Sequence, residues 1–242
     1  MNWHQQFQKQ AGWTADLRAY LFDKAGLGTA SRVLEVGCGS GAILAETRPS
    51  APPHGLDLSL ARLREARIHV PGALLLCADT LSLPYPAESF EVVFCHYLLL
   101  WVGDPLAALR EMRRVTRPGG HVLALAEPDY SQRVDEPPEL VPLGALQNRA
   151  LAAQGADPFV GGRLAELFAG AGIRLIETGP LAAGPGRSGE DEWEVIEADL
   201  RHIPLEAEVI QSYENLHRLA GLEGKRVLRV PTYFAWGRIN HV

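Results

Sequence analysis

The fold is decided by residues 32–41, which read Arg-Val-Leu-Glu-Val-Gly-Cys-Gly-Ser-Gly. Residues 32–36, which are mostly β-branched and aliphatic, predict a short buried strand. The glycines at 37, 39 and 41 predict a tight turn, because glycine has no Cβ and tolerates positive φ. A helix is expected to begin at Ala42, with Ser40 as its N-cap. Such a junction lets a ligand approach the free N–H groups of a helix N-terminus.

Glu35 indicates which kind of ligand this junction would hold. A carboxylate two residues before the first glycine would repel a pyrophosphate but would suit a positively charged or amino-bearing group. The glycine spacing is also G-x-G-x-G, whereas the dinucleotide fingerprint requires G-x-G-x-x-G. The stretch therefore favours a nucleoside cofactor other than a dinucleotide, and an ordinary turn without a ligand is the alternative.

Residues 35–41 resemble motif I of the class I S-adenosylmethionine (SAM) dependent methyltransferases. The resemblance implies that SAM is the cofactor. It also implies that part of this segment binds SAM, namely Glu35, Gly37, Cys38, Gly39 and Gly41.

Asp57 ends a second expected strand, at residues 54–57, and lies 20 residues after Gly37. An acid at this position is placed to accept hydrogen bonds from both ribose hydroxyls. The neighbouring Leu58 is assigned to the cofactor site as well. The alternative for Asp57 is a capping role just before Ser59, the expected N-cap of a helix over residues 60–68.

A third strand, at residues 73–79, ends in another acid, Asp79. By the family resemblance, Asp79 and Thr80 would bind adenine. The alternative is that both residues cap the short turn that follows. If the first reading holds, three strand ends line one cleft, as expected for parallel α/β sheets.

Residues 83–93, Leu-Pro-Tyr-Pro-Ala-Glu-Ser-Phe-Glu-Val-Val, resemble the small-molecule branch of these methyltransferases, the group that includes ubiquinone and menaquinone biosynthesis enzymes. A strand is expected at 90–95. By the resemblance, the following residues, from His96 to Trp101, lie nearest the sulfonium. Candidate aromatic partners for that cation are Tyr20, Tyr97 and Trp101.

A general base would help if the acceptor were a hydroxyl or a carbon acid. His96 is the first candidate, because it follows a strand at the cleft. Asp129 and Tyr130, which follow the strand expected at 121–126, are second. The alternative for His96 is a hydrogen-bonded wall residue.

The order of expected elements predicts an α/β fold with a Rossmann-like, seven-stranded, mostly parallel, doubly wound sheet and a helical cap. Residues 31–242 would form the SAM-binding domain, with cap insertions around 139–160 and 190–220. Residues 128–142 are expected to be a loop, 184–189 a link, and 227–239 a last strand or a bent pair. Residues 1–30 read as amphipathic helix, either a lid over the cleft or a cover for the sheet.

Composition limits the partners. The net charge is −6, which disfavours binding to nucleic acid. The basic cluster at residues 110–117 is expected to be a solvated helix face. Without an apolar run of about 18 residues or a signal core, we expect a cytoplasmic protein that does not enter membranes. The three cysteines lack metal spacing and are expected to be small, reduced core residues.

The sequence thus predicts a SAM-dependent methyltransferase that acts on a small-molecule acceptor, without a metal. Two alternatives stay open at this point: a non-catalytic SAM-binding protein, and a nicotinamide-dependent oxidoreductase. Glu35, the glycine spacing and Asp79 argue against the second. Neither the acceptor nor the oligomeric state can be read from the sequence.

Overall fold

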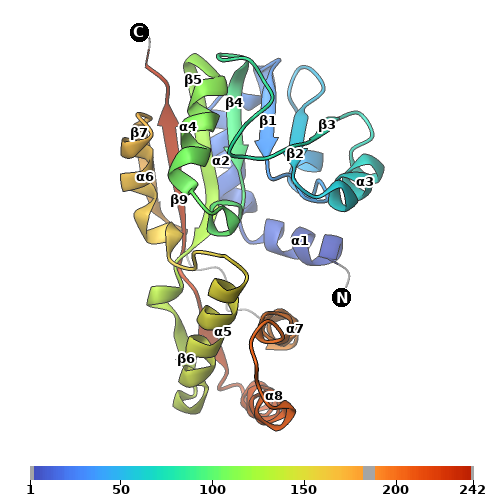
Figure 1. Ribbon diagram of the computed structural model, residues 1–242, viewed down its shortest axis with the longest axis vertical. Coiled ribbons are helices and arrows are strands. Elements are labelled where there is room, and N and C mark those ends of the chain that lie inside the picture. Colours follow the sequence, from blue (N-terminus) through green and yellow to red (C-terminus); the bar gives the residue numbers. More distant parts are fainter. Residues whose placement is uncertain (1–2, 182–188, 241–242) are drawn as a thin grey trace.

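The computed structural model describes residues 3–181 and 189–240, and a seven-stranded sheet forms its centre (Figure 1). The strand order is β3-β2-β1-β4-β5-β9-β7. Strands β1 to β5 pair in parallel, and β9 runs antiparallel to both β5 and β7. The strands are β1 Val33–Val36, β2 His54–Asp57, β3 Leu74–Cys77, β4 Phe90–Cys95, β5 Thr116–Pro128, β7 Arg174–Pro180 and β9 Thr232–Arg238. The predicted Rossmann-like, mostly parallel sheet is confirmed.

Helices cover both faces of this sheet. The α-helices around it are α1 Trp3–Gly12, α2 Ala15–Lys24, α3 Leu60–His69, α4 Pro105–Val115 and α6 Leu164–Gly170. Apolar side chains of α4 and α6 pack against one face of β1, β4 and β5, whereas those of α2 pack against the other. The sheet is therefore doubly wound, as the sequence predicts.

Side chains cap the starts of two helices, one of them at Ser59 as the sequence predicts. The Ser59 side chain accepts a hydrogen bond from the Arg62 N–H at 3.3 Å, at the start of α3. Asp104 accepts from the Ala107 N–H at 2.9 Å, and Pro105 occupies the first turn of α4. An N-cap oxygen satisfies a donor that the helix leaves without an internal acceptor.

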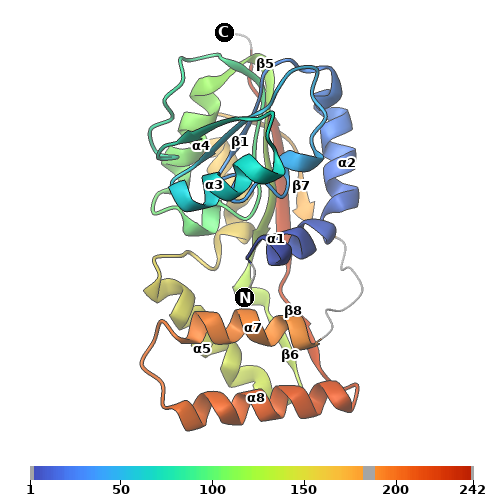
Figure 2. The same cartoon turned by 90° about the vertical axis from the view of Figure 1, so that its right-hand side faces the viewer.

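A second layer lies beyond one end of the sheet and forms the cap (Figure 2). It consists of α5 Val141–Ala153, α7 Gly189–Leu200 and α8 Ala207–Leu222, with a two-stranded sheet of β6 Val134–Glu136 and β8 Val227–Arg229. These elements share a hydrophobic core of their own, which includes Leu143, Trp193 and Leu228. The cap is thus a packed unit built from segments far apart in the chain.

Short 3₁₀-helices join many of these elements. They are η1 Leu27–Thr29, η2 Leu44–Glu46, η3 Leu99–Trp101, η4 Tyr130–Gln132, η5 Pro138–Leu140 and η6 Val160–Arg163.

The helix expected to begin at Ala42 is wrong: the structure has only η2 there, and Ser40 is not an N-cap. Instead, the Ser40 hydroxyl contacts His4 Nδ1 at 2.7 Å. Thr47 is already extended, with ψ of 145°, and Pro49 disfavours helical geometry at the residue before it. The chain therefore leaves the helical conformation after one short turn.

Three other predictions about the second half need correction or completion. The loop expected at 128–142 contains β6, a strand too short to show a period of two. The segment 227–239 is two strands in different sheets, with Pro231 between them. Of the link expected at 184–189, residues 184–188 lie outside the described residues, and Gly189 begins α7.

The β3 edge of the sheet is open. Leu74 and Leu76 are 53% and 40% exposed, and Cys77 is exposed too. The prediction that all three cysteines are core residues is therefore wrong for Cys77, while Cys38 and Cys95 are buried.

The basic cluster on and after α4 makes contacts within the chain. Arg114 binds Glu111 and donates to two backbone carbonyls, and Arg117 pairs with Glu91 at 2.9 Å. These contacts occupy guanidinium groups that an anionic partner would otherwise meet. Among residues 3–181 and 189–240, no helix has the length and apolar character that crossing a membrane requires.

Candidate active site

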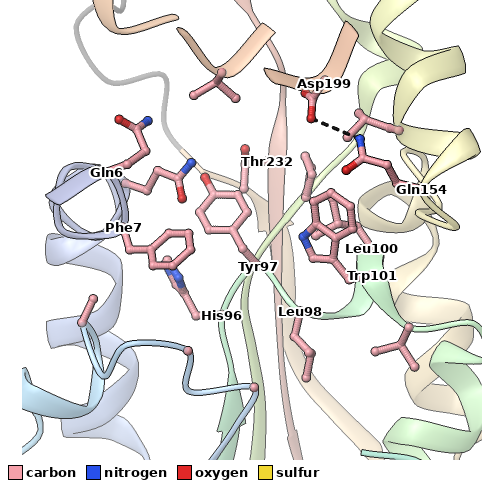
Figure 3. A pocket seen from close by; sticks show the side chains of 18 of the residues that line it. Gln6, Phe7, His96, Tyr97, Leu98, Leu100, Trp101, Gln154, Asp199 and Thr232 are labelled. Carbon is pink, nitrogen blue, oxygen red and sulfur yellow. Dashed lines mark hydrogen bonds between the residues drawn. The ribbon is translucent and has the colours of Figure 1, made fainter. Parts of the chain in front are cut away.

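A cavity of about 880 Å³ opens where the carboxyl ends of β1, β2, β3 and β4 face α1 and the cap (Figure 3). The predicted site residues that line it are Glu35, Gly37, Cys38, Gly39, Asp57, Leu58, Asp79, Thr80, His96, Trp101 and Tyr130. Side chains from three different strand ends thus meet in one cavity, as the sequence predicts. Within the described residues, no group of three or more His, Cys, Asp or Glu side chains could hold a metal ion.

The glycine turn brings backbone to the cavity wall. Gly37 and Gly39 have φ values of +73° and +53°, which L side chains rarely adopt. A Cβ at Gly37 would lie 2.5 Å from Leu98 Cδ1, so this position has no room for a side chain. A Cβ at Gly39 would meet only a Phe7 carbon, at 3.9 Å. Gly37 is therefore fixed by packing, whereas Gly39 leaves its space to a ligand.

Gly41, which was predicted to bind the cofactor, lies away from the cavity. Its φ is +82°, but a Cβ there would lie 2.9 Å from Val70 Cγ2 and 3.4 Å from Ala66 Cβ. Gly41 does not line the cavity. It allows the turn to pack against α3, and the prediction that it binds cofactor is not supported by its position.

Glu35 lies at the end of β1, with its side chain at the cavity and only 2% exposed. Its Oε2 atom is buried and accepts no hydrogen bond within the described part of the chain. Burial raises the pKa of Glu35 well above its usual range, although the nearby Arg18 opposes the shift. A buried carboxylate oxygen without a donor is costly, and a bound amino group would satisfy it.

Asp57 makes the contact to the Ser59 N–H that the alternative interpretation expects, and it also lines the cavity. Its Oδ1 accepts from the Ser59 N–H and its Oδ2 from the Gly39 N–H, both at 2.8 Å. The carboxylate therefore joins the end of β2 to the glycine turn. An ionised carboxylate has about four acceptor positions, so it retains capacity toward the cavity that it lines.

Asp79 follows β3 and lies in the same cavity. Its Oδ1 accepts from the Leu81 N–H at 2.9 Å, which is the turn-capping contact of the alternative interpretation. The second oxygen is not used in this contact. Asp79 is exposed and Thr80 is half-buried, so both are accessible to a ligand.

His96 is a half-buried residue of the cavity wall and contacts the N-terminal segment at Thr14. Its Nε2 lies 2.9 Å from the Thr14 hydroxyl, which also accepts a hydrogen bond from Arg18. Burial, with the charge of Arg18, lowers the pKa of His96 to about 3. A histidine with this pKa is neutral at pH 7 and binds a proton weakly, so the geometry favours the wall residue over the general base.

We expect His96→Gln to keep more than about a tenth of the single-turnover rate, because a lost base would cost about 10²–10⁴-fold. Glutamine retains a hydrogen-bonding group toward Thr14. The measurement is single-turnover methyl transfer at saturating acceptor across pH 6–9. A hundredfold loss that high pH relieves would restore His96 as the base.

Of the other two candidates for the general base, Asp129 and Tyr130, only Tyr130 lines the cavity. The Asp129 carboxylate accepts from the Ser131 N–H, the Ser131 hydroxyl and the Gln132 amide, at 2.6–2.9 Å. Asp129 does not line the cavity, so its position does not support the predicted role of base. Tyr130 lines the cavity and stays a candidate. Tyr20, a candidate partner of the sulfonium, instead donates to Glu177 at an exposed site.

The two N-terminal helices take different positions. Helix α1 lies over the cavity, which it lines with Gln6, Phe7, Lys9 and Gln10, and Trp13 follows it in the lining (Figure 3). Helix α2 instead covers the sheet through Leu21 and Phe22. The amphipathic pattern could not show which side chains reach the ligand.

Sequence reasoning missed Glu127, which lies one residue before the end of β5. Its side chain is fully buried, and it accepts from the Leu98 and Leu99 N–H groups at 3.0 Å and from the Leu100 N–H at 3.2 Å. Those residues belong to the segment 97–103 that lines the cavity. Tyr97, at its start, has φ of +49°, a conformation that a non-glycine residue adopts only under constraint. Glu127 thus holds a strained segment of the site in place.

Comparison with known proteins agrees with this geometry. Residues 34–124 match the family model described as "Methyltransferase domain". A malonyl-[acyl-carrier protein] O-methyltransferase of Halorhodospira halophila is 41% identical over 99 residues, which are 38% of this chain and 33% of that protein. A trans-aconitate 2-methyltransferase of Paracidovorax citrulli is 34% identical over 116 residues, 46% of this chain and 44% of that protein.

Among solved structures, a methyltransferase-like protein of Bacillus halodurans aligns with a TM-score of 0.66 at 17% identity, covering 92% of this chain and 98% of that one. This similarity concerns the fold alone. The chain spans less than half the length of the curated relatives described above. The sheet order and the glycine turn agree with the family match: residues 34–124 are similar to the methyltransferase domain, and the surrounding sheet has the corresponding fold.

Proposed function

We propose that the protein is a SAM-dependent methyltransferase that transfers a methyl group to a small-molecule acceptor. The observation that carries this proposal is the meeting of three carboxylates, Glu35, Asp57 and Asp79, in one cavity with the glycine turn. The cavity continues beneath the cap, which leaves space for a second molecule beside a nucleoside.

The residues fit the methyl donor group by group. Glu35, with its buried oxygen lacking a donor, suits the amino group of the methionine moiety. Asp57 suits the ribose hydroxyls, and Asp79 with Thr80 suits adenine. The open space above Gly39 allows close approach to backbone. When bound, SAM supplies a methyl group already activated for transfer.

The chain's contribution is then mainly to position the reactants and exclude water. Alignment of two reactants is worth roughly 7–11 kcal/mol of the barrier in favourable cases. Tyr97 and Trp101 supply aromatic faces at the centre of the cavity (Figure 3). Phe7, from α1, closes the opposite side. These rings suit a sulfonium or an aromatic acceptor, because an aromatic face attracts a cation.

Calorimetric titration of the full chain with SAM, its demethylated product and NAD tests the proposal. We expect both SAM and its product to bind at one site and NAD not to bind. Methyl transfer to one member of an acceptor panel would separate an enzyme from a non-catalytic SAM-binding protein. Tight NAD binding in the absence of SAM binding would overturn the proposal.

A further inference from the structure

The part of the cavity formed by the cap lies outside the family match, which ends at residue 124. Its lining comes from residues 128 onward and mixes apolar side chains with a similar number of polar ones. The polar residues that carry a charge or an amide are Arg133, Gln147, Gln154, Glu192 and Asp199. The chemistry of the acceptor must therefore be sought in residues that the family match does not reach.

The arginine in this lining, Arg133, already donates hydrogen bonds to other side chains of the protein. Arg133 donates to both oxygens of Asp135, at 2.5 and 3.1 Å, and also to the Gln147 side-chain oxygen. Its side chain is only 4% exposed. A bidentate, buried pair of this kind is costly to break, since it would leave Asp135 with less compensation. Arg133 is consequently poorly placed to receive a carboxylate from an acceptor.

The two arginines of this buried cluster, Arg133 and Arg226, are matched by two carboxylates other than Asp199. Arg226 binds Asp135 at 2.9 Å and lies 3.8 Å from Glu192, so two guanidinium groups face two carboxylates in this cluster. Asp199, on α7, is a further carboxylate in the cavity wall. Asp199 forms no ion pair among the described residues, although burial raises its pKa and the nearby charges of His202 and Arg133 lower it in part.

The orientation of Gln147 makes Asp199 an acceptor toward the cavity. Since Arg133 can only donate, Gln147 must present its oxygen to Arg133 and its NH₂ group to Asp199, at 2.8 Å. Gln154 also donates to Asp199, at 3.4 Å. Two neutral amides thus hold the carboxylate in position without neutralising it, and acceptor capacity is left on both of its oxygens.

Asp199 faces the cavity opposite the aromatic side chains of the segment that follows β4. Figure 3 shows Asp199 and Gln154 at one end of the cavity, with Tyr97 and Trp101 between them and His96. The other cations of the lining, Lys9 and Arg62, come from α1 and α3 and not from the cap. A molecule in this space would meet aromatic faces along its body and a carboxylate at its far end.

We propose that the acceptor carries a hydrogen-bond-donating head group, an ammonium or a hydroxyl, which Asp199 binds, and that the site discriminates against a carboxylate at that position. This inference rests on the proposed methyltransferase function. It separates this chain from the relatives named for malonyl-[acyl-carrier protein] and trans-aconitate, although their methyltransferase domains are similar. A carboxylate head would face Asp199 without a free cation in the cap lining to compensate it.

The test uses three probes with one skeleton: 2-phenylethylamine, 2-phenylethanol and phenylacetate. Each is titrated calorimetrically into the full chain saturated with the demethylated product of SAM. We expect the amine, and to a smaller extent the alcohol, to bind at least about tenfold more tightly than phenylacetate, as for a charge-assisted hydrogen bond. If only the amine binds, the head group of the acceptor is an ammonium. If the amine and the alcohol bind with comparable affinity, the head group is a hydroxyl.

The variant is Asp199→Asn, with Glu197→Gln as its matched control on the same helix. Glu197 pairs with Arg201 at 2.7 Å on the exposed side of α7 and does not line the cavity. We expect Asp199→Asn to abolish the preference for the amine and to leave SAM affinity unchanged, while Glu197→Gln changes neither. Thermal unfolding of both variants would report any loss of folding.

The outcomes of these titrations distinguish a failure of the methyltransferase proposal from a failure of the acceptor inference. Failure of the wild-type chain to bind SAM would refute the methyltransferase proposal itself. If SAM binds, three results would overturn only the acceptor inference. These are equal or tighter binding of phenylacetate, an unchanged preference in a folded Asp199→Asn variant, or no binding of either donor probe at millimolar concentration.

Discussion

Replacement of Glu127 by alanine is expected to lower the free energy of unfolding by roughly 2–4 kcal/mol. The carboxylate accepts from three consecutive backbone N–H groups, at Leu98, Leu99 and Leu100. Alanine would leave these donors without an acceptor in a buried environment, where each unsatisfied group costs about 1–3 kcal/mol before relaxation. Urea unfolding, with the exposed Glu166→Ala as control, measures the change.

The same variant should lose more than stability. The three leucines belong to the segment that carries Tyr97 and Trp101 into the cavity. Tyr97 holds a positive φ, so the segment would relax once its anchor is removed. We therefore expect weaker SAM binding in Glu127→Ala even where the protein is folded. A variant as stable as the wild type would show that these hydrogen bonds do not hold the segment.

Glu127 also predicts a dependence of stability on pH. Burial raises the pKa of Glu127 to about 7, from an ordinary value of 4.5. Between these values the folded protein retains a proton that the unfolded chain has lost, so the free energy of unfolding falls as pH rises. The fall amounts to roughly 3 kcal/mol across this window and is complete above pH 7. This contribution of Glu127 should be absent in Glu127→Gln, which keeps the contribution of Glu35, and urea unfolding of both proteins at pH 4.5, 6 and 8 makes the comparison. An identical pH dependence in the two would refute the assignment to Glu127.

The second large effect concerns Asp57. We expect Asp57→Asn to weaken SAM binding by more than about 1.5 kcal/mol, over tenfold, because the ribose hydroxyls would lose a charged acceptor. Asparagine keeps one oxygen for the Ser59 N–H, but its NH₂ group would face either the Gly39 N–H or the ligand. The glycine turn should therefore loosen as well.

The matched control for this variant is Asp104→Asn. Asp104 likewise accepts from a backbone N–H near a helix start, that of Ala107, but it does not line the cavity. Both variants should lose a similar amount of capping stability, and only Asp57→Asn should lose affinity for SAM. An unchanged dissociation constant for Asp57→Asn would remove this residue from the cofactor site.

The sequence predicted those parts of the site that depend on local order along the chain. Strand ends in a parallel sheet lie at one edge, so the spacing from Glu35 to Asp57 and Asp79 was enough to place three side chains together. The glycine turn was also predictable, because Gly37 and Gly39 have positive φ and glycine is the residue that adopts positive φ most readily.

The rest depended on contacts between distant segments. Glu127 is a buried acid whose partners lie 27–29 residues away, and Asp199 meets Gln147 across 52 residues. Strand β6 has only three residues and pairs with β8, some 90 positions later. None of these pairings has a periodic signal. The helix predicted after Gly41 failed for a local reason, since the chain is already extended at Thr47 and Pro49 disfavours helical geometry at the residue before it.

A crystal structure of the chain with the demethylated product of SAM tests the central claim most directly. The account predicts the product's amino group within hydrogen-bonding distance of Glu35, its ribose hydroxyls at Asp57 and its adenine at Asp79. The amino acid end should also lie against the backbone at Gly39. A nucleoside bound elsewhere, or bound in this cavity without contact to those three carboxylates, would contradict the account.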